Sequence, residues 1–260
     1  MLYRYVAVLL LLGVGLLGNV SLTQPVWAET HVQSLALTQV VVALRVGQAE
    51  LQKWVPAPWE ITPIAGGPLK GANLSLVFID VLLLQDGQGK PDLGGINRQV
   101  VLGVSAKNTQ TGELAPFTIG GLSANKLNVP GPYKNFVQAT LRREQTYKEA
   151  DIEAGGGEDF WEVRDAHGGI IELRVQYQRG LPSRAKSEMK MHSSVEPGFF
   201  RIYRIDTATD IVKSVSTGID RVQKYQLRVT VPEFRKLFDG TEQLVGIAVS
   251  PAYRREVFLP

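Results

Sequence analysis

Residues 74–84 read LSLVFIDVLLL and form one long apolar run. The turn-forming residues 71–73 (GAN) come directly before this run, and Asp86-Gly87 follows it. A run rich in Val, Ile, Leu and Phe between such residues is typical of a β-strand. This stretch therefore predicts that the chain is built around a β-sheet.

Shorter runs with the same character occur along the rest of the chain. They cover residues 40–46, 98–106, 160–163, 170–177, 199–205, 225–231 and 244–249. Between two of them, residues 165–169 (DAHGG) predict a hairpin turn. Helical patterns are few and short, and they cover residues 47–54, 134–143 and 231–238. Because strands and helices do not alternate, a parallel, doubly wound sheet is disfavoured.

The strand pattern predicts a protein of the α+β class. We expect a mostly antiparallel β-sheet, closed or nearly closed into a barrel, with a few short flanking helices. Around eight strands suit such a barrel, which has room for one small ligand. The sequence shows no internal repeat and no low-complexity linker, so we expect a single domain.

The first residues of the chain predict an export signal. Arg4 is followed by an apolar run at residues 6–17, a polar stretch and Val26-Trp27-Ala28. A short apolar segment between a basic start and a small-residue cleavage site is typical of a signal peptide, whereas a membrane span needs roughly 20 residues. We expect a signal peptide at residues 1–28 and a mature domain at residues 29–260. This domain would be exported, periplasmic or extracellular, with no membrane anchor after cleavage.

The composition narrows the classes of function. The chain has 28 basic and 25 acidic residues, and Arg4 is the only one of them within residues 1–28, so the mature charge is +2. This charge is too small to predict a nucleic-acid partner. There is no cysteine, and none of the three histidines has a second ligand at metal-binding spacing. Residues 66–71 (GGPLKG) do not match a phosphate-binding loop. We expect neither a metal nor another cofactor.

Residues 127–141 (LNVPGPYKNFVQATL) are the strongest candidate for chemistry. Two prolines and a glycine precede Lys134 at the point where the loop is predicted to enter a helix. A charged lysine is unfavourable at a helix N-terminus, and desolvation there would favour a neutral, nucleophilic amine. The alternative is an exposed loop lysine, which the sequence alone favours because lysine is rarely fully buried.

Two motifs resemble segments of the acetoacetate decarboxylase superfamily. Residues 131–136 (GPYKNF) are similar to its Gly-aromatic-Pro-Lys-Lys segment. Residues 50–60 (ELQKWVPAPWE) resemble its short helix that runs into an LP-x-x-L-E stretch, and a strand similar to residues 76–80 (LVFID) follows. The resemblance extends over residues 38–260. It implies a cone-shaped antiparallel β-barrel with helices outside and a ligand cavity inside.

The resemblance also implies roles for individual residues. In these decarboxylases a lysine forms a Schiff base with a β-keto acid, and the iminium accepts the electrons released as CO2 leaves. Lys134 matches that lysine and is the catalytic candidate. Asn135 stands where the family has a second lysine, and the family's glutamate would fall at Asn97 or Arg98. Tyr133, Asn135, Arg98 and Asn97 are the ligand-binding candidates. The family also suggests a homo-oligomer.

Three functions remain open at this point. The leading hypothesis is an exported protein with a decarboxylase-like barrel that binds a small organic carboxylate or carbonyl ligand in its cavity. The second is a cofactor-free carbon–carbon lyase of the decarboxylase type that forms a Schiff base through Lys134. The third is a structural or interaction module of the cell envelope with a filled interior.

Overall fold

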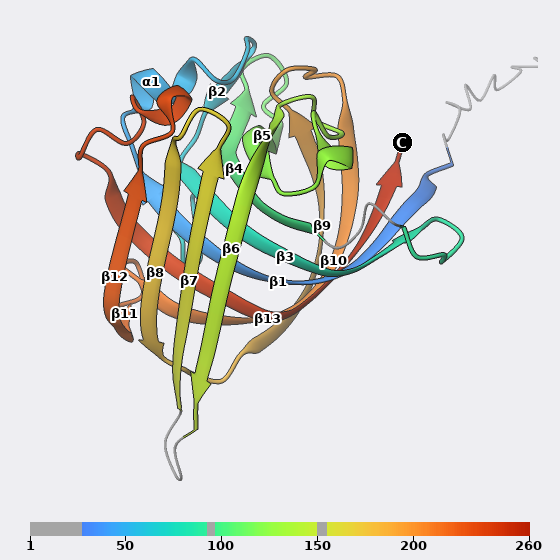
Figure 1. Cartoon of the computed structure of the whole chain (residues 1–260). Helices are drawn as coiled ribbons and strands as arrows, with labels where there is room; N and C mark the ends of the chain where they lie inside the picture. The colour runs from blue at the N-terminus through green and yellow to red at the C-terminus, as the bar shows by residue number, and fades with distance from the viewer. Residues whose placement is uncertain (1–27, 93–96, 150–154) are drawn as a thin grey trace, which may run out of the picture.

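A computed structural model describes residues 28–92, 97–149 and 155–260 of the chain (Figure 1). The predicted signal peptide lies outside these residues, apart from Ala28. Within the described ranges, no helix has the length and apolar character needed to cross a membrane.

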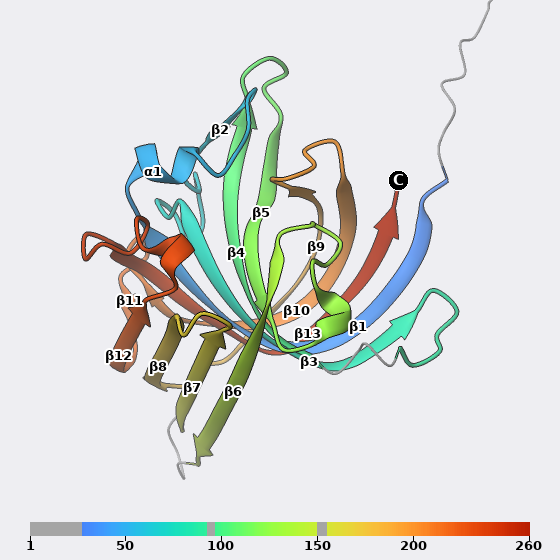
Figure 2. The same cartoon turned by 45° about the horizontal axis from the view of Figure 1, so that its top comes forward.

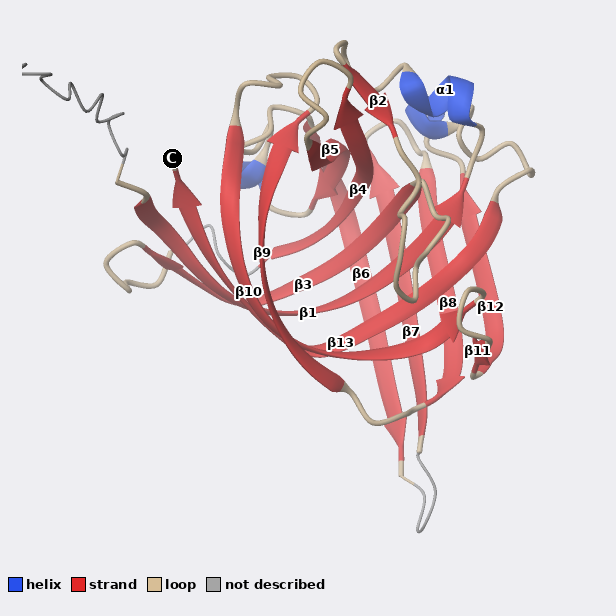
Figure 3. Cartoon of the chain, turned by 180° about the vertical axis from the view of Figure 1, so that it is seen from behind, coloured by secondary structure: helices blue, strands red, loops and turns tan. Residues whose placement is uncertain are grey.

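The described residues form thirteen strands and three very short helices, so strands dominate the molecule (Figure 3). The strands are β1 (Thr30–Arg45), β2 (Trp59–Ile61), β3 (Leu74–Asp86), β4 (Asn97–Asn108), β5 (Leu114–Ser123), β6 (Phe136–Lys148), β7 (Gly156–Asp165), β8 (Ile170–Gln178), β9 (Ser183–Ser193), β10 (Phe200–Ser214), β11 (Ile219–Asp220), β12 (Val222–Val229) and β13 (Gln243–Leu259). The helices are α1 (Gln48–Gln52) and the 3-10 helices η1 (Lys126–Asn128) and η2 (Pro232–Phe234).

Seven of the strands form a ring. Their order is β1, β3, β4, β5, β9, β10 and β13, and β13 pairs with β1 to close the circuit. All neighbours in the ring are antiparallel except β5 and β9, which share a short parallel pairing. Figure 2 shows these strands curving round, with the segment between β5 and β6 on the inner side. The prediction of a mostly antiparallel sheet, closed or nearly closed, is confirmed.

A second layer covers one side of the ring. It consists of β6, β7, β8 and β12, which pair as antiparallel neighbours. In Figure 1 this layer lies in front of β1, β3 and β13. Only three parallel residue pairs, from Gly121↔Phe136 to Ser123↔Gln138, connect it to the ring through β5 and β6. The two layers therefore associate mainly by packing their side chains against each other.

The position of β3 explains why residues 76–81 of its sequence are mostly apolar, whereas Leu82 and Leu83 at its end are exposed. Phe78 points to the second layer, where its ring centre lies 5.6 Å from that of Trp161. Val77, Ile79 and Val81 point to the inside of the ring. Because successive side chains of a strand alternate between its two faces, a strand buried on both faces needs apolar residues at nearly every position.

Two of the predicted helices differ from the structure. Residues 134–143 were predicted to be helical, but β6 begins at Phe136 and pairs with β7 from Ala139↔Asp165 to Lys148↔Gly156. This prediction was wrong because cross-strand pairing outweighs a weak local helix preference. The helix predicted at residues 231–238 is reduced to η2, whereas the one predicted at residues 47–54 is confirmed as α1.

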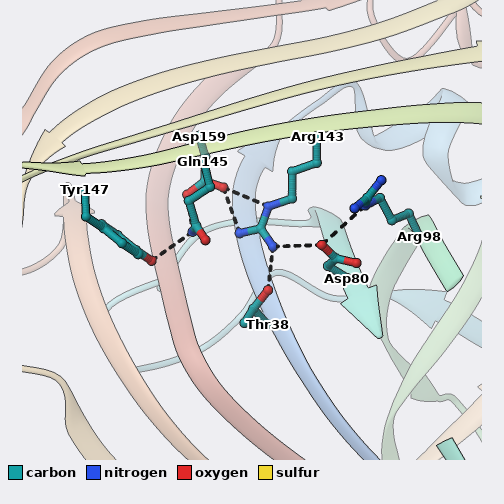
Figure 4. A network of polar contacts seen from close by, with 7 residues as sticks. All are labelled: Thr38, Asp80, Arg98, Arg143, Gln145, Tyr147 and Asp159. Carbon is teal, nitrogen blue, oxygen red and sulfur yellow. Dashed lines mark hydrogen bonds and ion pairs between the residues drawn. The ribbon is translucent and has the colours of Figure 1, made fainter. Parts of the chain in front are cut away.

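Arg143 on β6 connects the second layer to the ring (Figure 4). Its guanidinium donates from Nε and Nη2 to Asp159 Oδ1, at 3.0 and 2.8 Å. Nη1 donates to Thr38 Oγ1 at 2.6 Å and to Asp80 Oδ2 at 3.3 Å, on β1 and β3. The Arg143 side chain is only 6% exposed and that of Asp159 is fully buried. A buried charge is tolerated when it is paired and hydrogen-bonded in this way, so the network specifies how the layers align.

We expect Arg143→Met to destabilise the protein strongly. The substitution keeps the long apolar stem but leaves the buried Asp159 carboxylate without its cation. Breaking a buried pair from one side costs about 3–5 kcal/mol in the free energy of unfolding. Equilibrium unfolding in urea at neutral pH measures this loss.

Arg142 supplies the matched control. It is the preceding residue of β6, its side chain is exposed, and it forms an exposed pair with Glu144. Arg142→Met should change the free energy of unfolding by less than about 1 kcal/mol, as for other surface pairs. Equal small effects of both substitutions would show that the Arg143 network does not stabilise the contact between the layers.

Candidate functional site

The ring surrounds a cavity of about 580 Å³. Each of the seven ring strands contributes side chains to the lining, and residues 127–134 together with Phe136 cover one side. The volume lies within the range of roughly 300–1,000 Å³ that is usual for small-molecule sites. The cavity is therefore the candidate functional site.

Two arginines line this cavity, Arg201 on β10 and Arg255 on β13. Arg201 donates from Nη1 to Gln33 Oε1 at 3.0 Å. The guanidinium carbon of Arg255 lies 4.4 Å from the centre of the Tyr203 ring. In both arginines, Nε is buried and has no hydrogen-bond partner among the described residues. The described lining contains no Asp or Glu. The cavity therefore has an excess of positive charge and unused donors.

Tyrosines lie beside the two guanidiniums. The hydroxyls of Tyr133 and Tyr203 are hydrogen-bonded to each other. Burial, and then the neighbouring Tyr203, raise the pKa of Tyr133 well above its usual value, although Arg255 and Arg201 act in the opposite direction. Burial also raises the pKa of Tyr253. Tyr133 and Tyr253 are therefore neutral phenols at physiological pH.

The segment between β5 and β6 is held in place by neighbouring strands. Ser193 on β9 donates from Oγ to the Tyr133 carbonyl at 2.7 Å. Asn135 donates from Nδ2 to the Thr118 carbonyl on β5, also at 2.7 Å. These bonds attach the segment to the ring at Tyr133 and at Asn135. The Tyr133 side chain is thereby directed into the cavity.

Glycines allow this segment to pack closely. A Cβ atom at Gly121 would lie 2.5 Å from the Phe136 ring, so only glycine leaves room for that ring on β5. Gly131 has a φ of +69°, a conformation that glycine adopts without strain. Both glycines help to place residues 131–136 against the ring.

Lys134 lies in this segment, and its surroundings differ from the prediction. No helix begins there, and the residue has a φ of 61°, in the left-handed region. Its backbone N–H donates to the Gly131 carbonyl at 3.2 Å, which closes a turn. The residue is exposed as a whole and also contributes to the lining of the cavity. The residue is therefore accessible both to solvent and to a molecule in the cavity.

The other sequence-predicted site residues are divided between the cavity and its outside. Tyr133 and Asn97 line the cavity, and Asn97 donates from Nδ2 to Ser123 Oγ at 3.0 Å. Arg98 is exposed, and its Nε lies 3.3 Å from Asp80 Oδ2 instead of facing the cavity (Figure 4). Asn135 does not line the cavity, because its side chain is bound to β5 as described above.

Sequence reasoning did not identify Arg201, Tyr203 or Arg255. Each lies in a strand in which inward and outward positions alternate, as in Tyr253, Arg255 and Val257 on one face of β13. The sequence signal that could have identified them is a charged residue at a strand position where the alternation predicts an inward-facing apolar side chain. Among the described residues, no three His, Cys, Asp or Glu side chains gather to form a metal site.

Comparisons with known proteins identify the fold. No protein-family model matches the sequence, and no curated protein matches it. Solved structures do match. The enduracididine biosynthesis enzyme MppR in complex with pyruvate has 10% identity and a TM-score of 0.56, over 93% of this chain and 91% of the other.

Two further matching structures are named after acetoacetate decarboxylase, the superfamily that the two sequence motifs resemble. An acetoacetate decarboxylase-like enzyme from Sphingomonas wittichii has 8% identity and a TM-score of 0.53, over 90% of this chain and 94% of the other. The acetoacetate decarboxylase of Legionella pneumophila has 11% identity and a TM-score of 0.51, over 93% and 91%. At such identities the likeness establishes the fold alone. The chain has a divergent acetoacetate decarboxylase-like fold, as its two motifs indicated.

Proposed function

We propose that this protein binds a small organic carboxylate in the cavity of the ring. The observation that carries the proposal is the pair Arg201 and Arg255, whose buried Nε atoms lack hydrogen-bond partners among the described residues. No acidic side chain of the described lining neutralises them. A bound carboxylate would supply both the missing charge and the missing acceptors.

The energetics favour this arrangement. A partly buried guanidinium without an anion loses hydration and gains no ion pair in return. Its planar, fork-shaped set of donors matches the two oxygens of a carboxylate. The neutral phenol of Tyr133 adds a hydroxyl that carries no competing negative charge. MppR, which shares the fold, has been crystallised with pyruvate, itself a small carboxylate. The open cavity also supports binding over the alternative of an envelope module with a filled interior.

A second candidate function is imine chemistry at Lys134. It is favoured by the position of this residue at the lining of the same cavity. A carbonyl ligand held by Arg201 and Arg255 could condense with the amine to form an iminium and release water. The second lysine and the glutamate of the decarboxylases have no counterpart here, because Asn135, Asn97 and Arg98 occupy those positions. We therefore place ligand binding first and lyase activity second.

We also propose that the protein works outside the cytoplasm. The support is the order of a basic start, a short apolar segment and Val26-Trp27-Ala28 in the sequence. Cofactor-free ligand binding or lysine chemistry suits such a location, because neither depends on cytosolic cofactors.

We expect Arg201→Met and Arg255→Met each to weaken carboxylate binding. Hydrogen bonds to charged groups contribute about 1.5–3 kcal/mol, so each loss should lower the affinity roughly 10- to 100-fold. Isothermal titration calorimetry with pyruvate and with butyrate measures the effect. Arg254→Met is the control, because Arg254 is the exposed neighbour of Arg255 and does not line the cavity. Carboxylate binding that is unchanged in both cavity variants would contradict the proposal.

We expect Lys134 to be trapped by borohydride if it forms an imine. Acetoacetate plus borohydride should then give a stable secondary amine on Lys134, found by peptide mass spectrometry. Lys134→Ala should abolish the adduct, and Lys134→Arg should not restore it. Lys126 serves as the internal control, since it is exposed in η1 and does not line the cavity. No adduct, or equal labelling of both lysines, would exclude imine chemistry at this site.

We expect export to yield a mature protein that begins at Glu29. Expression of the full chain in a secreting bacterium, followed by intact-mass and N-terminal peptide analysis, tests this. Ala28→Leu should leave the leader attached, because signal peptidase needs a small residue before the cut. A wild-type protein that retains Met1 would refute the proposal of export.

A further inference from the structure

The walls of the cavity differ in chemical character. The guanidiniums project from β10 and β13, whereas every lining residue of β3 is aliphatic, and β4 adds Val101 beside two amides. Counting round the ring from β10 in one direction, β3 is the third strand, after β13 and β1. Counting in the other direction, β4 is the third strand, after β9 and β5. The charged and the aliphatic walls therefore face each other across the cavity.

Three valines form a continuous apolar patch on the aliphatic side. Val41 on β1 pairs directly with Val77 on β3, and Val77 pairs with Val101 on β4. All three line the cavity and are only half-buried, so their side chains still have accessible surface. We call them the valine row. Contact with an apolar group would remove this surface from water, which is favourable.

The valine row lies well away from the guanidiniums. Arg255 pairs with Leu35 on β1, and Val41 is six residues further along the same strand. At about 3.3 Å per residue, this separation is roughly 20 Å measured along the strand. A two- or three-carbon acid held by Arg255 cannot also cover the valine row. A longer acid can contact both.

We infer that the ligand is a monocarboxylate with an extended apolar body. This inference rests on the proposed carboxylate site. The carboxylate binds Arg201 and Arg255, and the apolar body extends across the cavity to the valine row. Ile79 and Val81, which also line the cavity from β3, pack along the body between these two ends. On β1, β3 and β4 the described lining carries amides but no cation, so a second carboxylate at the far end of the ligand would lose its hydration without gaining an ion pair from these strands.

A series of straight-chain acids tests the inference. Affinities for acetate, butyrate, octanoate and dodecanoate are measured by calorimetry on the full mature protein. Each added methylene that is buried should strengthen binding about three- to fourfold. Dodecanedioate has the length of dodecanoate but a second carboxylate, and it should bind at least roughly tenfold more weakly than dodecanoate.

Substitutions in the valine row locate the apolar end. Val77→Thr and Val101→Thr keep the size of the side chain but place a hydroxyl in the patch. Each should weaken dodecanoate binding severalfold and leave butyrate binding unchanged. Val137→Thr is the matched control, because Val137 lies exposed on β6 and does not line the cavity.

The outcomes separate this inference from the proposal on which it rests. If no acid of any length binds in a way that depends on Arg201 or Arg255, the carboxylate site itself is wrong. If binding depends on these arginines but not on chain length, only the inference about the apolar body fails. Dodecanedioate binding as tightly as dodecanoate would overturn it as well.

Discussion

The wall formed by β1, β3 and β4 has one face in the hydrophobic core and the other on the cavity, and the rest of the structure depends on this constraint. One face packs against the second layer, as the Phe78–Trp161 contact shows, and the other bounds the cavity. Because side chains alternate along a strand, one wall supplies both the main hydrophobic core and the lining of the site. The cavity can thus stay open while the fold is stabilised on the opposite face of the same strands.

The arginine between the two layers has acidic neighbours, whereas the arginines of the cavity have none in its described lining. Arg143, between the layers, is matched by Asp159 and Asp80, so its charge is neutralised within the protein. Arg201 and Arg255 have no acidic residue in the described lining of their cavity. The matched arginine aligns the layers, whereas the two unmatched arginines of the cavity are the groups that we propose bind a carboxylate. The comparison distinguishes structural from functional charge in the same molecule.

Local sequence predicted the antiparallel sheet, β3 and the small helix α1, because these follow from apolar runs and turn residues. Local sequence did not predict the features that depend on contacts between distant parts of the chain. β5 was missed because Gly120 and Gly121 interrupt its pattern, although Gly121 is needed beside Phe136. The segment around Lys134 was assigned to a helix start, but pairing with β7 makes the following residues a strand. Arg201 and Arg255 are recognisable as partners only once the ring brings β10 and β13 together.

The bonds that attach residues 131–136 to the ring also affect how a ligand would bind. Ser193 holds the Tyr133 carbonyl, and Thr118 holds the Asn135 side chain. This segment therefore loses its conformational entropy when the chain folds, and little of that entropy remains to be lost on association. A receptor that is already ordered in this way discriminates among ligands by shape, because it does not rearrange to fit each one.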